Sequence, residues 1–355
     1  MSEKVLMKGN EALAEAAIRA GCHHFFGYPI TPQTELAAYM AKRLPKIEGG
    51  VFLQAESEVA AINMVMGASA AGARVMTSSS SPGISLKSEG VSYIAGCDLP
   101  CLIINIQRGG PGLGGIQPSQ ADYFQATKAL GHGDYQLIVL APSSVQEMVD
   151  LAYKAFELGD TYRTPVMILG DGALGQMMEP VELPQPSDAN KHDKSWATTG
   201  HQNKREHNII NSLYMEPSDL ERTIIERYKR YDTIKDKEVM CEQYLVDDAD
   251  FIVVAYGMTA RIAKSAVNTL RSQNIKAGLI RPITLWPFPQ KEIAKAAQSA
   301  KAFLVVEMSM GQMVEDVKLA VNGKKEVKFF GRTGGVIPTP AEVVEHVKAL
   351  RGGAE

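Results

Sequence analysis

The chain has 355 residues, of which 45% are hydrophobic and 22% charged, a composition that excludes disordered and fibrous proteins and leaves room for about two domains. Its 37 basic and 40 acidic residues nearly cancel, so the sequence lacks the basic footprint of a nucleic-acid-binding protein. No apolar run is long enough to span a bilayer, and the first residues lack the apolar core of a signal peptide. We therefore expect a cytoplasmic protein without nucleic-acid or membrane partners.

Helical and strand patterns alternate at short intervals over residues 1–180, which predicts an α/β fold with a parallel sheet covered by helices. Helices are expected at residues 10–21, from residue 32 onward, at 57–71 and at 145–158. Strands are expected at residues 24–28, 51–54, 74–79, 102–107, 137–141 and 165–170.

The pattern weakens over residues 187–242, where polar and charged residues gather, and we interpret this segment as a linker. Within it, residues 217–231 have helical spacing and many charges, which predicts a solvated or partner-facing helix. A second α/β unit follows. Its strands are expected at residues 251–256, 278–281, 303–307 and 327–330, and its helices near 260–271, 290–297, 314–321 and 341–350. The predicted domains are therefore residues 1–186 and 243–355.

The four cysteines, Cys22, Cys97, Cys101 and Cys241, are too few and too scattered for a disulfide framework. The spacing of Cys97 and Cys101 fits neither a zinc knuckle nor an iron–sulfur motif, so buried structural thiols are favoured. An iron–sulfur centre of this chain's own is not expected.

The segment Gly27-Tyr28-Pro29-Ile30-Thr31-Pro32 joins a predicted strand to a predicted helix, at the strand end where open α/β sheets bind ligands. Thr31 is expected to cap that helix and Pro32 to be its first residue, so the segment is also explained as a well-formed helix start. The two prolines favour a ligand site, because they fix the backbone on both sides of a hydroxyl group.

A second strand-to-helix junction carries two carboxylates, Glu56 and Glu58. Acidic residues are common in the first turn of a helix because the macrodipole favours them. However, the following helix at 59–71 is almost wholly apolar, so a carboxylate at its start is expected beside a buried surface, where it can meet a ligand nitrogen.

These motifs resemble a known family. Tyr28-Pro-Ile-Thr-Pro, then Glu56-Ser-Glu58 with Gly67-Ala-Ser-Ala-Ala-Gly72, and then Thr77-Ser-Ser-Ser-Ser-Pro-Gly83 occur in the order seen in the 2-oxoacid:ferredoxin oxidoreductases. Arg281-Pro-Ile-Thr-Leu-Trp-Pro-Phe-Pro and Gly331-Arg-Thr-Gly-Gly extend the match over nearly the whole chain. The sequence is most similar to the alpha subunit of the branched-chain, 3-methyl-2-oxobutanoate type. The resemblance implies a pyrimidine-type thiamine-diphosphate-binding domain followed by a transketolase C-terminal-like domain.

The resemblance also implies roles for individual residues. The glutamate that bonds the cofactor's aminopyrimidine N1′ falls on Glu58, with Glu56 as the rival. Thr31 matches the substrate-site threonine and Arg108 the arginine that pairs with the oxoacid carboxylate, for which a planar guanidinium is well suited. Tyr28 and Thr31 are expected to contact the cofactor.

Three other motifs are weaker. Gly110, Gly112 and Gly115 spell G-x-G-x-x-G, but no helix is expected directly after them, so a mobile loop beside the substrate is favoured over a dinucleotide site. Gly170-Asp171-Gly172 opens the magnesium motif of thiamine-diphosphate enzymes, but the asparagines that complete it are missing. The turn at Gly257 could receive an anion such as coenzyme A or be a tight strand-to-helix turn, and the tight turn is favoured.

The resemblance therefore implies a chain that is active only with partners. A beta subunit would hold the diphosphate and Mg²⁺, and ferredoxin-like and gamma-type subunits would hold the iron–sulfur clusters. The assembly would convert a 2-oxoacid and coenzyme A to an acyl-CoA and CO₂, with electrons passing to ferredoxin. The alternatives are the same chemistry on 2-oxoglutarate, a non-catalytic transketolase-like scaffold, and a nucleotide-dependent dehydrogenase.

Overall fold

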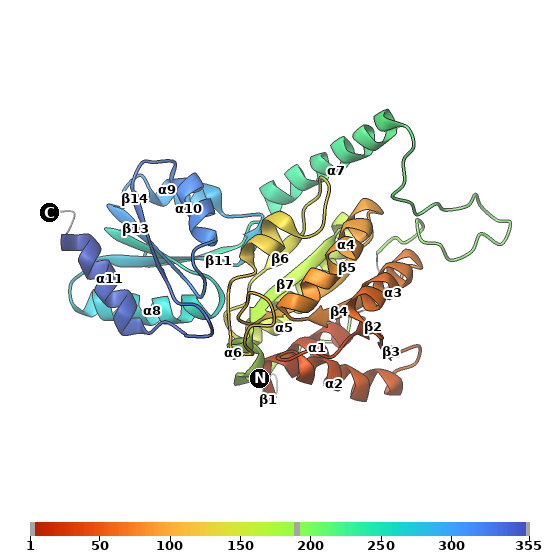
Figure 1. The fold of residues 1–355 in the computed structure, drawn as a ribbon, viewed down its shortest axis with the longest axis horizontal. Helices are drawn as coiled ribbons and strands as arrows, with labels where there is room; N and C mark the ends of the chain where they lie inside the picture. Colours follow the sequence, from red (N-terminus) through yellow and green to blue (C-terminus); the bar gives the residue numbers. More distant parts are fainter. Residues whose placement is uncertain (1–3, 188–191, 353–355) are drawn as a thin grey trace.

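The computed structural model describes residues 4–187 and 192–352, which form two large β-sheets, a two-stranded ribbon and flanking helices (Figure 1). Both large sheets are mainly parallel, and the predicted α/β class is confirmed. The most polar part of the predicted linker, residues 188–191, lies outside the described residues.

The first sheet contains seven strands in the order β12-β6-β7-β5-β4-β2-β3. Apolar side chains alternate between its two faces, as Ile103 and Ile104 on β5 show by joining different cores. Helices α1, α2 and α5 cover one face, and α3 and α4 cover the other. The strands are β2 (His24–Gly27), β3 (Val51–Gln54), β4 (Val75–Ser79), β5 (Cys101–Gln107), β6 (Ile138–Leu140), β7 (Pro165–Asp171) and β12 (Thr284–Trp286). The helices are α1 (Gly9–Arg19), α2 (Thr34–Arg43), α3 (Glu58–Ala70), α4 (Ser81–Gly96) and α5 (Val145–Tyr162).

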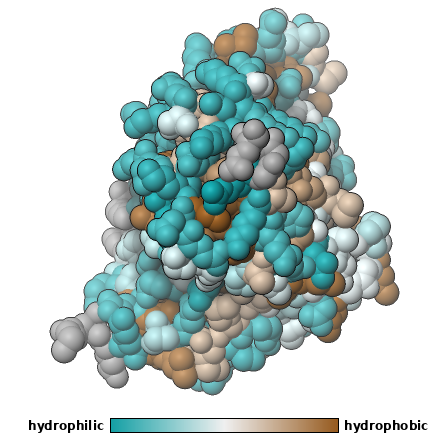
Figure 2. Space-filling view, turned by 90° about the vertical axis from the view of Figure 1, so that its left-hand side faces the viewer, coloured by the Kyte–Doolittle hydropathy of each residue, from teal (hydrophilic) through white to brown (hydrophobic). Residues whose placement is uncertain are grey.

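The second sheet has the order β14-β13-β10-β11-β9, with β9 antiparallel at one edge. Its strands are β9 (Cys241–Tyr244), β10 (Phe251–Val254), β11 (Ala277–Pro282), β13 (Ala302–Glu307) and β14 (Glu326–Gly331). Helices α8 (Gly257–Ser272) and α11 (Pro340–Gly352) pack on one face, and α9 (Gln290–Ala296) and α10 (Met313–Val321) on the other. The side of the molecule that carries this sheet is mostly hydrophilic on its surface (Figure 2).

The two sheets are joined by a shared core and by an exchanged strand. The core that contains α3 and α4 continues into α9 and α10 without a break. The chain also returns to the first sheet after β11, where β12 pairs antiparallel with β6. There Trp286 packs edge-on against Tyr231, with ring centroids 5.6 Å apart. The division of the chain into domains at residues 186 and 243 stays a prediction.

Three local expectations differ from the structure. Helix α4 was not expected, because serine and glycine fill much of its sequence and weaken the helical pattern. Helix α2 begins at Thr34 and not at Pro32, because Gln33 holds the preceding loop: its amide donates to Tyr28 O (3.2 Å) and its Oε1 accepts from Ser78 Oγ (2.7 Å). The charged helix α7 (Pro217–Lys237) extends beyond the predicted residues 217–231 and buries Ile234.

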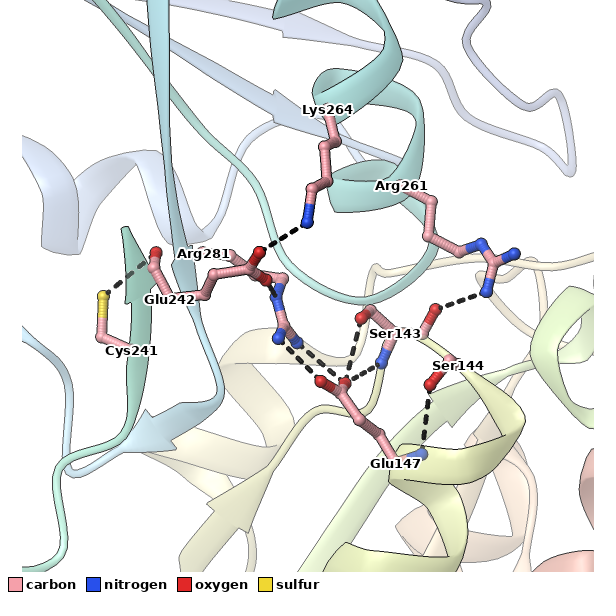
Figure 3. A network of polar contacts seen from close by, with 8 residues as sticks. All are labelled: Ser143, Ser144, Glu147, Cys241, Glu242, Arg261, Lys264 and Arg281. Atoms are coloured by element: carbon pink, nitrogen blue, oxygen red, sulfur yellow. Dashed lines mark hydrogen bonds and ion pairs between the residues drawn. The ribbon is translucent and has the colours of Figure 1, made fainter. Parts of the chain in front are cut away.

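An ion-pair network lies between the two sheets (Figure 3). Arg281 at the end of β11 donates two bonds to Glu147 on α5 (2.9 and 2.7 Å) and one to Glu242 on β9 (2.7 Å). Lys264 on α8 donates to the other oxygen of Glu242 (2.7 Å). A cavity of about 400 Å³ opens beside these residues. Because Arg281 of the second sheet pairs with Glu147 on a helix of the first, the network fixes the second sheet against the first.

Candidate active site

Every site residue predicted from the sequence follows the carboxyl end of one of three parallel strands of the first sheet. Tyr28 and Thr31 follow β2, Glu58 follows β3, and Arg108 follows β5. Strand β4 lies between β5 and β2 and leads into α4. Open α/β sheets bind ligands at the carboxyl ends of their parallel strands, so these residues lie at the end of the sheet where a ligand site is expected.

Glu58 is the first residue of α3 and is buried, with 7% of its surface exposed. The helix start is fixed by Ser57, whose Oγ accepts from the Ala60 N–H (3.1 Å). The rival acid, Glu56, is exposed. Only Glu58 therefore matches the expectation of a carboxylate beside a buried surface.

Gly83 in the first turn of α4 leaves the space that the Glu58 side chain occupies. A methyl group added at Gly83 would lie 2.7 Å from Glu58 Oε1 and 2.2 Å from Ser79 Oγ. Close contact of a backbone with a functional group is one of the positions where only glycine fits.

Three hydroxyl groups at the end of β4 are buried and lack a hydrogen-bond partner within the described part of the chain: Thr77 Oγ1, Ser79 Oγ and Ser80 Oγ. Unpaired buried hydroxyls are costly, and native proteins keep them mainly where a ligand or water completes them. Of these unused groups, Ser79 Oγ lies with the Glu58 carboxylate against Gly83.

Arg108 is brought together with Thr31. Its Nη1 donates to Thr31 O (2.9 Å) and its Nη2 to Leu113 O (3.2 Å), while its buried Nε has no partner among the described residues. The main chain of Thr31 is thus part of the Arg108 site. Thr31 and Tyr28 are both exposed residues.

Two charged residues of this region were not singled out from the sequence. Asp122 accepts from Ser81 Oγ (2.5 Å) and from Asn105 Nδ2 (2.9 Å), and Ser81 Oγ in turn accepts from the Arg108 N–H (3.1 Å). Burial raises the pKa of Asp122 above its ordinary value. Lys87 on α4 is fully buried beside α3. If α4 had been predicted as a helix, Lys87 would have been placed one turn after Gly83, on the same face of that helix.

The glycine-rich segment after Arg108 forms a loop. Arg108 bridges Pro118, and the Gly109 N–H donates to Gln117 O (3.0 Å), which closes the loop at its base. Residues 111–119 form no helix, so the G-x-G-x-x-G pattern lacks the helix that a dinucleotide site requires. Leu113 is 85% exposed and Ile116 is 58% exposed on this loop.

Two of the weaker motifs, Gly170-Asp171-Gly172 and the turn at Gly257, contact each other. Asp171 caps the short helix α6 (Gly172–Gln176) and accepts from the N–H groups of Ala173 (2.9 Å) and Leu174 (3.1 Å). It also accepts a backbone hydrogen bond from Met258 at the start of α8. The carboxylate thus fills the turn at Gly257, as expected for a tight structural turn. Burial raises the pKa of Asp171 to about 6.

The four cysteines are free thiols. Burial raises the pKa of Cys22, of Cys101 and of Cys241 to about 12, which leaves these thiols protonated. Within residues 4–187 and 192–352, no three His, Cys, Asp or Glu side chains gather as a metal site. No helix in the same ranges is long and apolar enough to cross a membrane.

Comparisons with known proteins agree with this geometry. Residues 15–244 match the family described as pyruvate flavodoxin/ferredoxin oxidoreductase, thiamine diP-binding, and residues 249–343 match pyruvate:ferredoxin oxidoreductase core domain II. The chain is 47% identical to the ketoisovalerate oxidoreductase subunit VorB of Methanothermobacter marburgensis, over 98% of both chains. It is 37% identical to the 2-oxoglutarate synthase subunit KorA of the same organism, over 99% of this chain and 100% of that one.

Solved structures give the same result. The 2-oxoglutarate:ferredoxin oxidoreductase from Magnetococcus marinus, solved with 2-oxoglutarate, coenzyme A and succinyl-CoA bound, superposes with a TM-score of 0.88 at 28% identity. The match covers 98% of this chain and 65% of that one. A split-gene transketolase, with a TM-score of 0.60 at 16% identity over 97% of both chains, shares the fold. The predicted resemblance is confirmed: the chain belongs to the 2-oxoacid:ferredoxin oxidoreductase family, as a subunit with a thiamine-diphosphate-binding domain.

Proposed function

We propose that this chain provides the pyrimidine half of a thiamine-diphosphate site in an enzyme that oxidatively decarboxylates a branched 2-oxoacid, best described as 3-methyl-2-oxobutanoate. The observation that carries the proposal is the buried Glu58 carboxylate at the start of α3, which lies against Gly83 together with the unpaired hydroxyl of Ser79. These residues fit the cofactor's aminopyrimidine ring, because a carboxylate and hydroxyls can pair with its ring and amino nitrogens.

When bound, thiamine diphosphate would supply the nucleophilic carbon and take up the electrons released by decarboxylation. Glu58 would hold a proton between its carboxylate and N1′ of the pyrimidine ring. Its burial strengthens that hydrogen bond, because few water molecules compete for it. The burial of Glu58 and the exposure of Glu56 support Glu58 over Glu56 for this role.

Arg108 and Thr31 would bind the substrate. The unpaired Nε of Arg108 is available for the oxoacid carboxylate, and the two carbonyl oxygens that hold its terminal nitrogens keep the guanidinium oriented. The hydroxyl of Thr31, on the residue whose carbonyl holds Arg108, would donate to the ketone oxygen. Tyr28 would contact the cofactor from the end of β2.

The branched substrate is supported by the loop after Arg108 and by the similarity to the VorB chains. Leu113, whose main-chain oxygen accepts from Arg108, and Ile116 are exposed aliphatic residues of this loop, and a hydrocarbon substrate tail can bury apolar surface against such side chains. A second carboxylate, as in 2-oxoglutarate, would gain nothing from these two side chains. An assay of the complex with both oxoacids tests this choice.

Partner chains would complete the enzyme. The diphosphate and Mg²⁺ are assigned to a beta subunit and the iron–sulfur clusters to ferredoxin-like and gamma-type subunits, with coenzyme A and ferredoxin as co-substrates. Two observations support this assignment: the relatives are named as subunits, and Asp171 of the Gly-Asp-Gly motif is already used to cap α6 and α8.

The test is the pair Glu58→Gln and Glu56→Gln in the assembled complex. We expect Glu58→Gln to lower thiamine-dependent turnover by at least about 10²-fold, the lower end of the range for loss of a general acid–base group, while the complex still assembles. Glu56→Gln should keep wild-type turnover. Wild-type rates in Glu58→Gln would refute the role of Glu58, and a wild-type complex that turns over no 2-oxoacid would favour a non-catalytic scaffold.

A further inference from the structure

We infer that Lys87 is a positioning residue for Glu58: from its buried place on α4, it places its ammonium group beside Glu58, holds the main chain of that residue and fixes the first turn of α3. This inference rests on the proposed role of Glu58 in the cofactor site. It assigns a function to a charged group that the proposed mechanism does not otherwise use.

The first argument is burial. The Lys87 side chain is fully buried between α3 and α4. Lysine is almost never fully buried unless it is paired, because removing an ammonium group from water is costly. A simple packing role would be filled at lower cost by an apolar side chain of similar length, such as methionine.

The second argument is the pairing. Lys87 Nζ donates to the main-chain oxygen of Glu58 at 3.4 Å, and this is its only hydrogen bond within the described residues. Burial lowers the pKa of Lys87 to about 8, and the Glu58 carboxylate acts in the opposite direction. Glu58 on α3 is the one charged group that affects Lys87 among the described residues; α4 and the strands beneath contribute none.

The third argument is geometry. Gly83 and Lys87 are one turn apart on α4, so both lie on the same face of that helix. Gly83 makes room for the Glu58 carboxylate, and Lys87 holds the main chain of the same residue. Helix α4 therefore constrains both the side chain and the main chain of Glu58, and the group that holds the main chain is a buried cation.

The first test measures the coupling in the full-length chain without cofactor. Lysine ε-carbon signals are followed by NMR against pH, and Lys87→Met identifies the Lys87 signal. In the wild type we expect Lys87 to titrate near pH 8. In Glu58→Gln it should titrate at lower pH, because the favourable carboxylate is lost. An unchanged titration in Glu58→Gln would overturn the inference.

The second test measures function in the assembled complex, with the exposed Lys42→Met as the matched control. We expect Lys87→Met to bind thiamine diphosphate, to keep its KM for the oxoacid within about twofold, and to lose about tenfold in kcat, because a misplaced reacting group lowers the rate of the chemical step. Lys87→Arg keeps the charge and the donor, so it should restore kcat to within about twofold of the wild type. Lys42→Met should behave as the wild type.

The outcomes separate the two proposals. If Glu58→Gln is inactive but Lys87→Met has wild-type kcat, only the inference on Lys87 fails. If Lys87→Arg loses as much kcat as Lys87→Met, Lys87 has only a packing role and the inference is overturned. If Lys87→Met does not assemble, Lys87→Arg decides: it keeps the charge, so wild-type kcat is expected, and a loss of about tenfold would overturn the inference. Wild-type activity in Glu58→Gln would refute the proposed function itself.

Discussion

The substitution Gly83→Ala would displace the proposed catalytic acid without removing it. The new methyl carbon would lie 2.7 Å from Glu58 Oε1, against 3.4 Å for an ordinary contact, so the carboxylate has to move by about 0.7 Å. The nearer atom, Ser79 Oγ at 2.2 Å, belongs to a short side chain that has no hydrogen bond to lose among the described residues. The main effect is therefore expected at Glu58.

The expected result is a loss of activity that exceeds the loss of stability. Misplacement of a reacting group by 1 Å costs about 10²-fold in rate, so we expect kcat to fall by about 10- to 100-fold. Stability should change by less than about 2 kcal/mol, because overpacking costs about 1–3 kcal/mol and the better helix propensity of alanine returns up to about 1 kcal/mol.

The assay compares Gly83→Ala with Gly67→Ala. Gly67 lies in α3, and a methyl group there would meet nothing within 4 Å. Turnover is measured in the assembled complex, and urea unfolding in the isolated chain. Gly67→Ala should keep wild-type turnover and unfold at slightly higher urea. Wild-type turnover in Gly83→Ala would refute the placement of Glu58 against α4.

Three other substitutions have expected outcomes. Ser81→Ala removes the acceptor of the Arg108 N–H, so we expect KM for the oxoacid to rise by about tenfold, the worth of one hydrogen bond, with little change in kcat; an unchanged KM would argue against this support. Arg281→Met leaves Glu147 without its buried partner and should lower the free energy of unfolding by about 2–4 kcal/mol, measured by urea; a wild-type midpoint would contradict it. The pKa of Asp171 is about 6 in the folded chain and 3.8 in the unfolded chain, so the folded chain binds this proton more tightly. The contribution of Asp171 to stability therefore falls as the pH rises from 3.8 to about 6. Asp171→Asn should lose that slope, and parallel pH profiles of wild type and variant would disprove the effect.

The sequence predicted most of the strands correctly because buried parallel strands are short, continuous apolar runs. Strand β5, whose seven residues are all buried, is an example. Strand β12 could not be found in the same way, since three residues carry no periodicity and their partner β6 lies more than a hundred residues earlier in the chain. Helix α4 was missed because serine and glycine have low helix propensity, while Gly83 and Gly90 lie where residues of α3 leave no room for a side chain.

For the site, the sequence indicated the residue types but not their surroundings. The difference in exposure between Glu56 and Glu58 depends on the packing of α4, which no local pattern contains. The partners of Arg108 are main-chain oxygens, and main-chain positions are set by the fold alone. The assignments of Tyr28, Thr31, Glu58 and Arg108 stay predictions until the substitutions are made.

The exchange of β12 between the sheets has a consequence for any attempt to divide the protein. A fragment that stops at residue 244 would lack β12, so β6 would present unpaired backbone groups along an open border, a common starting point for aggregation. It would also leave Tyr231 without Trp286 beside it. Separate production of the two halves should therefore give insoluble material unless the short stretch at Thr284–Trp286 is grafted onto the first half.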